Sequence, residues 1–124
     1  MKFVELKKTL KTKIDNAYII FGSDRFLQSK SMNLINSNCI DDFKEMNETV
    51  YNDENINVQQ MLEIAQTLPF MSKRRVIFVK ECFSKLNDGE KNRIIEYLKK
   101  PVATTVLVFV AEEKNEFLKK CDAY

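Results

Sequence analysis

Apolar residues follow two patterns along the chain. Continuous apolar runs lie within residues 17–21, 75–80 and 104–110, and such runs are typical of strands that are buried on both faces of a parallel sheet. Elsewhere, apolar residues recur at intervals of three or four, which predicts amphipathic helices over residues 3–14, 26–35, 58–68, 90–100 and 112–121. Strands and helices in this order favour right-handed crossovers, and therefore an α/β domain whose mostly parallel sheet has helices on both faces.

Polar caps and prolines set the ends of several predicted helices. Ser23 or Asp24 caps the second helix and Asn57 caps the third, because a side-chain oxygen at these positions can accept from an unpaired backbone N–H. Pro69 ends the third helix, since the residue before a proline is pushed away from helical geometry. Pro101 stops the fourth helix for the same reason.

Two connecting segments have weaker patterns. Residues 43–46 predict a short strand, whereas residues 48–57 are polar and acidic and predict a loop. A turn is predicted over residues 87–89, where Asn-Asp-Gly precedes a helix.

The length and composition are those of one globular domain. The chain has 124 residues, of which 44% are hydrophobic and 31% are charged, so a single domain is expected to cover residues 1–124. Its 20 basic and 18 acidic residues give a net charge of +2. So weak a bias argues against a dedicated nucleic-acid-binding domain, in which basic residues dominate one face.

Residues for metal, disulfide or histidine chemistry are scarce. The chain has no histidine, and Cys39, Cys82 and Cys121 are far apart, so neither a metal site nor a disulfide framework is expected. Structural thiols fit a reducing cytoplasm. The first residues lack the apolar core of a signal peptide, and no run approaches the ~20 apolar residues of a membrane-spanning helix, so no membrane partner is expected.

One segment has the layout of a phosphate-binding loop without its residues. Such a loop needs a glycine, then a second glycine followed by lysine and serine or threonine, so that backbone N–H groups and the lysine reach phosphate. Aligned to this pattern, Gly22 takes the first position, while Leu27, Gln28 and Ser29 replace the second glycine, the lysine and the hydroxyl. Leu27 adds a side chain where none fits and Gln28 has no charge, so no nucleotide cofactor is expected.

The second strand also lacks the acidic pair of an ATPase. It ends with Lys80-Glu81, where an ATPase places Asp-Glu to hold magnesium and orient water. ATP hydrolysis is therefore not expected. The strand–glycine–helix layout also occurs in many α/β folds, so its similarity to a phosphate loop could be accidental.

Four segments of the chain occur in an informative order and spacing. They are YIIFGSDRFL at 18–27, AQTLPFMSKRRV at 65–76, YLKKP at 97–101 and TVLVFV at 105–110. Together they resemble the N-terminal domain of the delta subunit of the bacterial DNA polymerase III clamp loader. The similarity extends from about residue 17 to residue 121, and the second segment is its most specific part.

This resemblance implies an AAA+-type domain that has lost nucleotide binding. It implies a non-catalytic subunit, without ATPase activity of its own, that belongs to a polymerase holoenzyme with nucleotidyltransferase activity. The subunit would bind the ring-shaped sliding clamp (the beta subunit) and help to open it during DNA replication in the bacterial cytoplasm. This chain would be the first of about three domains. The absent lid and collar would contact the gamma/tau and delta prime subunits, and DNA would be contacted only indirectly.

The resemblance also places a clamp-binding element at the end of the helix before the second strand. Its projecting side chains are Leu68, Phe70 and Met71, and Gln66 and Thr67 lead into them. An aromatic residue beside a methionine makes an adaptable anchor for an apolar pocket. Two alternatives stay open, because Phe70 could instead cover the core and Leu68 also continues the inward face of the preceding helix.

Two other functional classes stay open from the residues alone. An NTP-binding or NTPase domain would have to use an atypical phosphate loop. A receiver-like phosphoacceptor domain would need clustered acids and a partner lysine, for which only Asp24 and Lys80 are candidates. The basic run at 72–75 is interpreted as a solvated loop, and the acidic pairs at 41–42 and 112–113 as surface charge.

Overall fold

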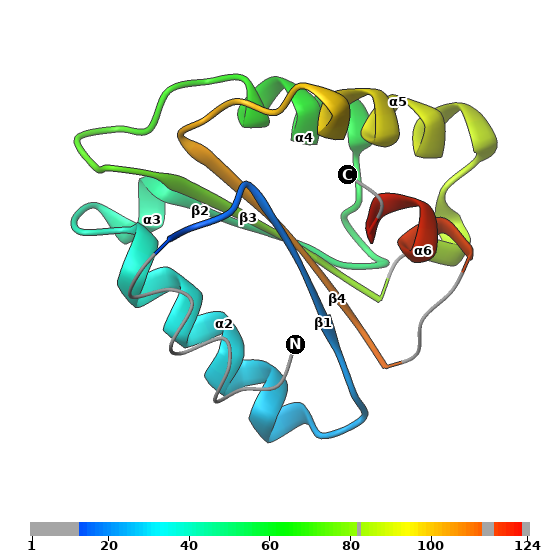
Figure 1. Ribbon diagram of the computed structural model, residues 1–124, viewed down its shortest axis with the longest axis horizontal. Helices are drawn as coiled ribbons and strands as arrows, with labels where there is room; N and C mark the ends of the chain where they lie inside the picture. The colour runs from blue at the N-terminus through cyan, green and yellow to red at the C-terminus, as the bar shows by residue number, and fades with distance from the viewer. Residues whose placement is uncertain (1–12, 82, 113–115, 123–124) are drawn as a thin grey trace.

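A sheet of four parallel strands forms the centre of the protein, in the order β1-β4-β3-β2 (Figure 1). The computed structural model describes residues 13–81, 83–112 and 116–122. β4 lies between β1 and β3 and is buried along its whole length, which explains its uninterrupted apolar sequence. The parallel sheet expected from the apolar runs is confirmed. The strands are β1 (Ala17–Phe21), β2 (Glu48–Tyr51), β3 (Arg75–Lys80) and β4 (Thr105–Ala111).

Helices cover both faces of the sheet, because successive side chains of a strand point to opposite sides. One face carries Phe78 and Val108, which pack with Ile35 of α2. The other face carries Ile77 and Phe109 and packs against α4, α5 and α6, and Figure 1 shows these helices on the side of the sheet opposite α2. The helices are α2 (Arg25–Cys39), α3 (Lys44–Asn47), α4 (Val58–Ala65), α5 (Asp88–Lys99) and α6 (Glu116–Asp122), and a 3-10 turn, η1, covers Phe83–Lys85.

Side-chain caps begin α2, α4 and α5. Asp24 caps α2 and Asn57 caps α4, as predicted. Asn87 caps α5 through a reciprocal pair of bonds with Glu90, an arrangement that satisfies two otherwise unpaired backbone N–H groups. The predicted turn at 87–89 is therefore the cap and first turn of α5, so this helix begins two residues earlier than the pattern indicated.

The region between α2 and α4 differs from the sequence prediction. Residues 44–47 form the short helix α3 in place of the predicted strand, and Phe43 before it has a left-handed backbone with φ 53°. β2 lies inside the predicted loop, at the edge of the sheet beside β3. Its Glu48 and Thr49 remain partly exposed. A short edge strand needs no continuous apolar run, so the pattern did not reveal it.

Helix α4 ends at Ala65, before Pro69 is reached, so the proline does not terminate it. Thr67 closes the last turn, because its N–H bonds the carbonyl of Ile64 at 3.0 Å and its hydroxyl bonds that of Glu63 at 2.9 Å. Satisfying these free carbonyls ends the helix locally. The predicted helix was therefore too long at its C-terminal end.

Two predicted helices are tested only in part. The helix predicted over residues 3–14 lies outside the described residues except for its last two positions, and these two residues belong to no helix. α6 confirms the last predicted helix from residue 116 onward, while residues 113–115 lie outside the described part. Within the described ranges, no helix has the length and apolar character needed to cross a membrane.

We expect Phe78→Ala to lower the free energy of unfolding by about 3–5 kcal/mol, because Phe78 is fully buried in β3. Val50→Ala on the edge strand, where the side chain is 37% exposed, should change it by about 0.5 kcal/mol. Urea unfolding followed by circular dichroism measures both. Equal losses in the two variants would contradict the placement of the core.

Candidate functional site

Residues 66–74 connect α4 to β3 and are called the corner loop here; the loop lies at the left of the view in Figure 1. It contains the five residues singled out from the sequence. Leu68 and Met71 are each 71% exposed and Phe70 is 42% exposed, and Gln66 and Thr67 are exposed as well. Phe70 is therefore not sealed in the core, and Leu68 does not continue the inward face of α4. Large apolar side chains are usually buried, so this exposure calls for an explanation.

Two further exposed apolar residues lie beside the corner loop. Phe43 is 40% exposed and Met46 is 53% exposed. The rings of Phe43 and Phe70 meet edge to face, with centroids 5.1 Å apart at an angle of 82°. Sequence reasoning missed both because it assigned residues 43–46 to a strand, although a spacing of three is also the spacing of one helix face. Together with Leu68, Phe70 and Met71 they form what we call the corner surface.

The two ends of the corner loop are attached to the start of β4. The hydroxyl of Thr105 donates to the carbonyl of Ala65 at 2.6 Å, in a buried position. The N–H of Arg75 donates to the carbonyl of Thr104 at 2.9 Å. Because β4 is buried throughout, the loop leaves and re-enters the fold at fixed points.

Asn47 anchors the middle of the loop. It is the last residue of α3 and has no exposed surface. Its Oδ1 accepts from the N–H of Phe70 at 2.7 Å, and its Nδ2 donates to the carbonyl of Phe70 at 2.8 Å. The same Nδ2 donates to the carbonyls of Asp42 and Phe43, each at 3.1 Å. The sequence analysis did not single out this residue.

Arg75 links the two segments a second time. Its Nη1 donates to the carbonyl of Met46 at 3.1 Å and its Nη2 donates to the carbonyl of Leu68 at 3.2 Å. The side chain is 9% exposed, so the interpretation of residues 72–75 as a solvated run is wrong for its last residue. A guanidinium has five donors in a rigid fork, which suits it to bridging two carbonyls.

Asp41 holds the far side of the loop. Its Oδ1 accepts from the hydroxyl of Ser72 at 2.8 Å and from the N–H of Lys73 at 3.0 Å. The hydrogen bond from the Ser72 hydroxyl, followed by that from the Lys73 N–H, lowers the pKa of the Asp41 carboxyl. Asp41 is on the surface, as predicted, but it also ties the loop to the segment after α2.

Two of the three non-glycine residues with positive φ in the described part of the chain lie at the corner surface, and the third is Glu81. Phe43 and Met71 have positive φ values of 53° and 48°, in a region that costs non-glycine residues on the order of 1–3 kcal/mol. Such conformations persist when the surrounding contacts fix them. The bonds made by Asn47 and Arg75 provide that restraint on both sides of Phe70.

The segment that resembles a phosphate loop has a different geometry at the opposite end of the strands. α2 begins at Arg25, only three residues after Gly22. The Asp24 carboxylate accepts from the N–H groups of Phe26 and Leu27, at 3.0 and 3.2 Å. These are N–H groups that a phosphate at the helix N-terminus would need. The Leu27 side chain is 45% exposed.

The two remaining positions of that segment also differ from a phosphate site. Gln28 is buried, and its Nε2 donates to the carbonyl of Gly22. The side chain at the position of the phosphate-binding lysine therefore forms a hydrogen bond within the turn between β1 and α2. Ser29 lies in the first turns of α2 and is exposed.

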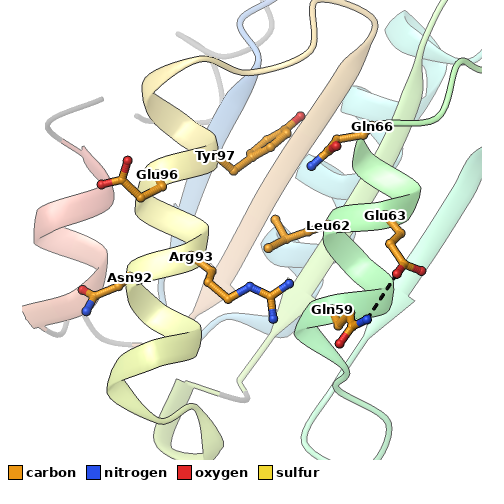
Figure 2. A pocket seen from close by; sticks show the side chains of 8 residues that line it. All are labelled: Gln59, Leu62, Glu63, Gln66, Asn92, Arg93, Glu96 and Tyr97. Carbon is orange, nitrogen blue, oxygen red and sulfur yellow. Dashed lines mark hydrogen bonds between the residues drawn. The ribbon is translucent and has the colours of Figure 1, made fainter.

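An open groove lies between α4 and α5 (Figure 2). Arg93 extends from α5 toward α4 in Figure 2, and Gln59 donates to Glu63 at 3.4 Å. The lining includes two carboxylates, those of Glu63 and Glu96, and the guanidinium of Arg93. The lining residues are Gln59, Leu62, Glu63, Gln66, Asn92, Arg93, Glu96 and Tyr97.

Other reactive groups are buried or dispersed. Burial raises the pKa of the Cys39 thiol to about 11, so this thiol is protonated near neutral pH and is a poor nucleophile. Burial also raises the pKa of Tyr97, whose hydroxyl accepts from the N–H of Val102 at 3.3 Å. In the part of the chain that the structure describes, no cluster of three or more acidic or cysteine side chains could hold a metal ion.

Comparison with protein families adds a match over most of the chain. The family model described as "DNA polymerase III, delta subunit" matches residues 18–123. The DNA polymerase III subunit delta of Bacillus subtilis (strain 168) is 27% identical over 129 residues, covering 97% of this chain and 37% of that relative. The chain therefore spans little more than a third of the length of this curated relative.

Comparison with solved structures supports the same fold. The Bacillus subtilis DNA clamp loader delta protein matches with a TM-score of 0.80 and 22% identity, over 96% of this chain and 39% of that one. A DNA polymerase III gamma subunit-related protein of Thermotoga maritima gives a TM-score of 0.65 at 12% identity, over 94% and 42%. A mutant RuvB of Thermotoga maritima gives 0.58 at 14%, over 94% and 39%. These similarities show that the AAA+-like fold is shared.

We expect Asp41→Asn to flatten the dependence of stability on acidic pH. The pKa of Asp41 is lowered below its ordinary 3.8 in the folded protein, so its stabilising contribution is present above that value and is lost as the pH falls through the folded pKa. Urea midpoints measured between about pH 2 and pH 6 test this.

Asp42→Asn is the matched control for that measurement, because the Asp42 carboxylate accepts from the N–H of Phe43 and not from the corner loop. The same flattening in both variants would contradict a specific role for Asp41.

Proposed function

This chain belongs to the DNA polymerase III delta subunit family, and we propose that it binds the sliding clamp through its corner surface and helps to open the clamp ring. The observation that supports this proposal best is the exposure of large apolar side chains on a backbone that buried polar groups hold in place. Leu68, Phe70 and Met71 project from the corner loop, and Phe43 and Met46 flank them. Gln66 and Thr67 complete the proposed contact at the base of the loop.

The corner surface has the properties of an anchor for an apolar pocket on a partner protein. Interface hot spots are usually a few large side chains that fill such pockets. Phe70 supplies a rigid ring whose main chain is fixed by Asn47, and Met71 supplies a flexible thioether that adapts to an irregular pocket. Because the loop is ordered before binding, less conformational entropy would be lost on association.

Opening a ring by this means requires no chemistry in this domain. Binding only has to be stronger for the open or strained clamp than for the closed one. We therefore propose a non-catalytic role in DNA replication in the bacterial cytoplasm. The gamma/tau and delta prime subunits would contact parts of the protein beyond this chain, and DNA would be contacted only through the assembly.

The proposal assigns nucleotide hydrolysis to other subunits. At the start of α2 the Asp24 carboxylate already accepts from two N–H groups, and it would also repel a phosphate. Leu27 and Gln28 add a side chain and a hydrogen bond where a phosphate loop needs space and a positive charge.

We expect Phe70→Ala and Met71→Ala in the full-length natural protein each to weaken binding to purified sliding clamp. Truncating a hot spot costs about 2–4 kcal/mol, which corresponds to roughly a 30-fold to 1,000-fold higher Kd. Surface plasmon resonance on immobilised clamp measures the change.

Phe26→Ala is the matched control, because Phe26 is an even more exposed phenylalanine, at 68%, at the other end of the strands. Its Kd should stay within about twofold of wild type. Unchanged binding by the Phe70→Ala, Met71→Ala double variant would rule out the proposed site.

We also expect no saturable ATP binding below about 1 mM, with or without magnesium. The physical reason is the Asp24 carboxylate at the helix N-terminus, together with the uncharged Gln28 in the lysine position. Titration with a fluorescent ATP analogue measures it. Micromolar affinity would favour the alternative of an NTP-binding domain with an atypical loop.

A further inference from the structure

Asn47 is a buried polar residue whose bonding is devoted to the corner surface. Its side chain has no exposed surface, and an amide in such a position is costly unless its hydrogen bonds are made. All four bonds of its amide go to main-chain atoms: two to Phe70, one to Phe43 and one to Asp42. Each of these atoms lies in one of the two segments that carry the exposed apolar residues.

The orientation of this amide follows from its partners. One of them, the Phe70 N–H, is a donor, and the other three are carbonyl acceptors. Only an amide side chain supplies an acceptor and two donor hydrogens from one planar group. An aspartate could not donate to the carbonyls, and a leucine of similar size could neither donate nor accept.

The two bonds to Phe70 hold its main chain as a neighbouring strand would. Residues 47 and 70 are 23 positions apart in sequence, so this contact fixes the loop relative to α3. The bond to the Phe43 carbonyl fixes the second aromatic residue from the same group. The edge-to-face contact of the two rings, at 5.1 Å, is then a consequence of where their main chains are held.

Asn47 also holds these segments in their strained backbone conformations. Phe43 and Met71 have left-handed backbones that relax readily when nothing holds them. Without the amide, the N–H and carbonyl of Phe70 would lose their partners, and the loop would have to be ordered again at each binding event.

We infer that Asn47 is a positioning residue for clamp binding: it acts through the main chains of Phe70 and Phe43 to hold the corner surface in its binding conformation before the partner arrives. This inference rests on the proposed function and assigns part of the affinity to a residue that the partner does not touch.

The test compares Asn47→Ala with Gln28→Ala in the full-length natural protein. Gln28 is a suitable control, because it is also a buried side-chain amide, and its Nε2 donates to the carbonyl of Gly22 at the end of the strands opposite the corner loop. Both variants should lower the urea midpoint. Only Asn47→Ala should raise the Kd for purified sliding clamp, by about tenfold, and an equal effect of both variants would overturn the inference.

A double-variant cycle with Phe70→Ala separates this inference from the proposed function. If Asn47 acts through Phe70, adding Asn47→Ala to Phe70→Ala should weaken binding much less than it does in the wild-type background. The inference would be overturned if the effects of the two substitutions on the free energy of clamp binding were fully additive. It would also be overturned if Asn47→Ala bound the clamp with wild-type affinity while Phe70→Ala bound it more weakly. No effect of Phe70→Ala would instead reject the proposed binding site.

Hydrogen exchange of the wild-type protein keeps the inference testable if Asn47→Ala does not fold. The amide of Phe70 should exchange at least about tenfold more slowly than in an unstructured peptide, since its N–H donates a hydrogen bond to Oδ1 of Asn47. Exchange at the unprotected rate would show that the main chain at Phe70 is not held, and the inference would fall.

Discussion

The pairing of β3 with β4 determines where the corner loop can be. Arg75 opens β3 opposite Thr105 in β4, and the Thr105 hydroxyl also bonds the carbonyl of Ala65 at the end of α4. One residue of the central strand therefore sits beside both ends of the loop. Because β4 is paired with a strand on each side, these ends cannot shift without breaking the sheet. The main chain that carries the exposed side chains of the loop is therefore held in place at both of its ends.

The corner reverses the usual distribution of polar and apolar groups. Its buried members, Asn47 and Arg75, are polar, whereas Leu68, Phe70 and Met71 are exposed. Hydrogen bonds are directional and apolar contacts are not, so buried polar groups can fix a loop whose apolar side chains do not contribute to the core. This arrangement leaves the apolar area available to a partner, in line with the proposed clamp contact.

The two ends of the parallel strands differ in character. In open α/β sheets, ligands usually bind beyond the carboxyl ends of the strands. There, the cap formed by Asp24 and the bond from Gln28 to Gly22 close the turn between β1 and α2. The corner surface lies at the amino end of β3. We therefore propose that this domain, whose fold resembles that of nucleotide-binding domains, binds a partner protein at the amino end of its strands.

The parts of the fold that rest on continuous or periodic burial could be predicted from the amino-acid sequence. The strands at 17–21 and 75–80, the strand predicted at 104–110 and found at 105–111, and helices α2, α4 and α5 follow from apolar runs and spacing. Burial on two faces of a strand or on one face of a helix selects residue type directly. The interpretation of the segment after Gly22 as a degenerate phosphate loop rests on the residue types that Leu27 and Gln28 replace. The residues of the corner loop came from family resemblance, because a pattern does not distinguish an exposed phenylalanine from a buried one.

The surroundings of that loop could be identified only in the three-dimensional structure. β2 is a short edge strand with polar residues, α3 has a single turn, and neither gives a periodic signal. The role of Asn47 depends on a partner 23 positions away, and Arg75 was indistinguishable in sequence from its solvated neighbours. Long-range hydrogen bonds to main-chain carbonyls cannot be predicted from residue types, because every residue has the same main-chain carbonyl.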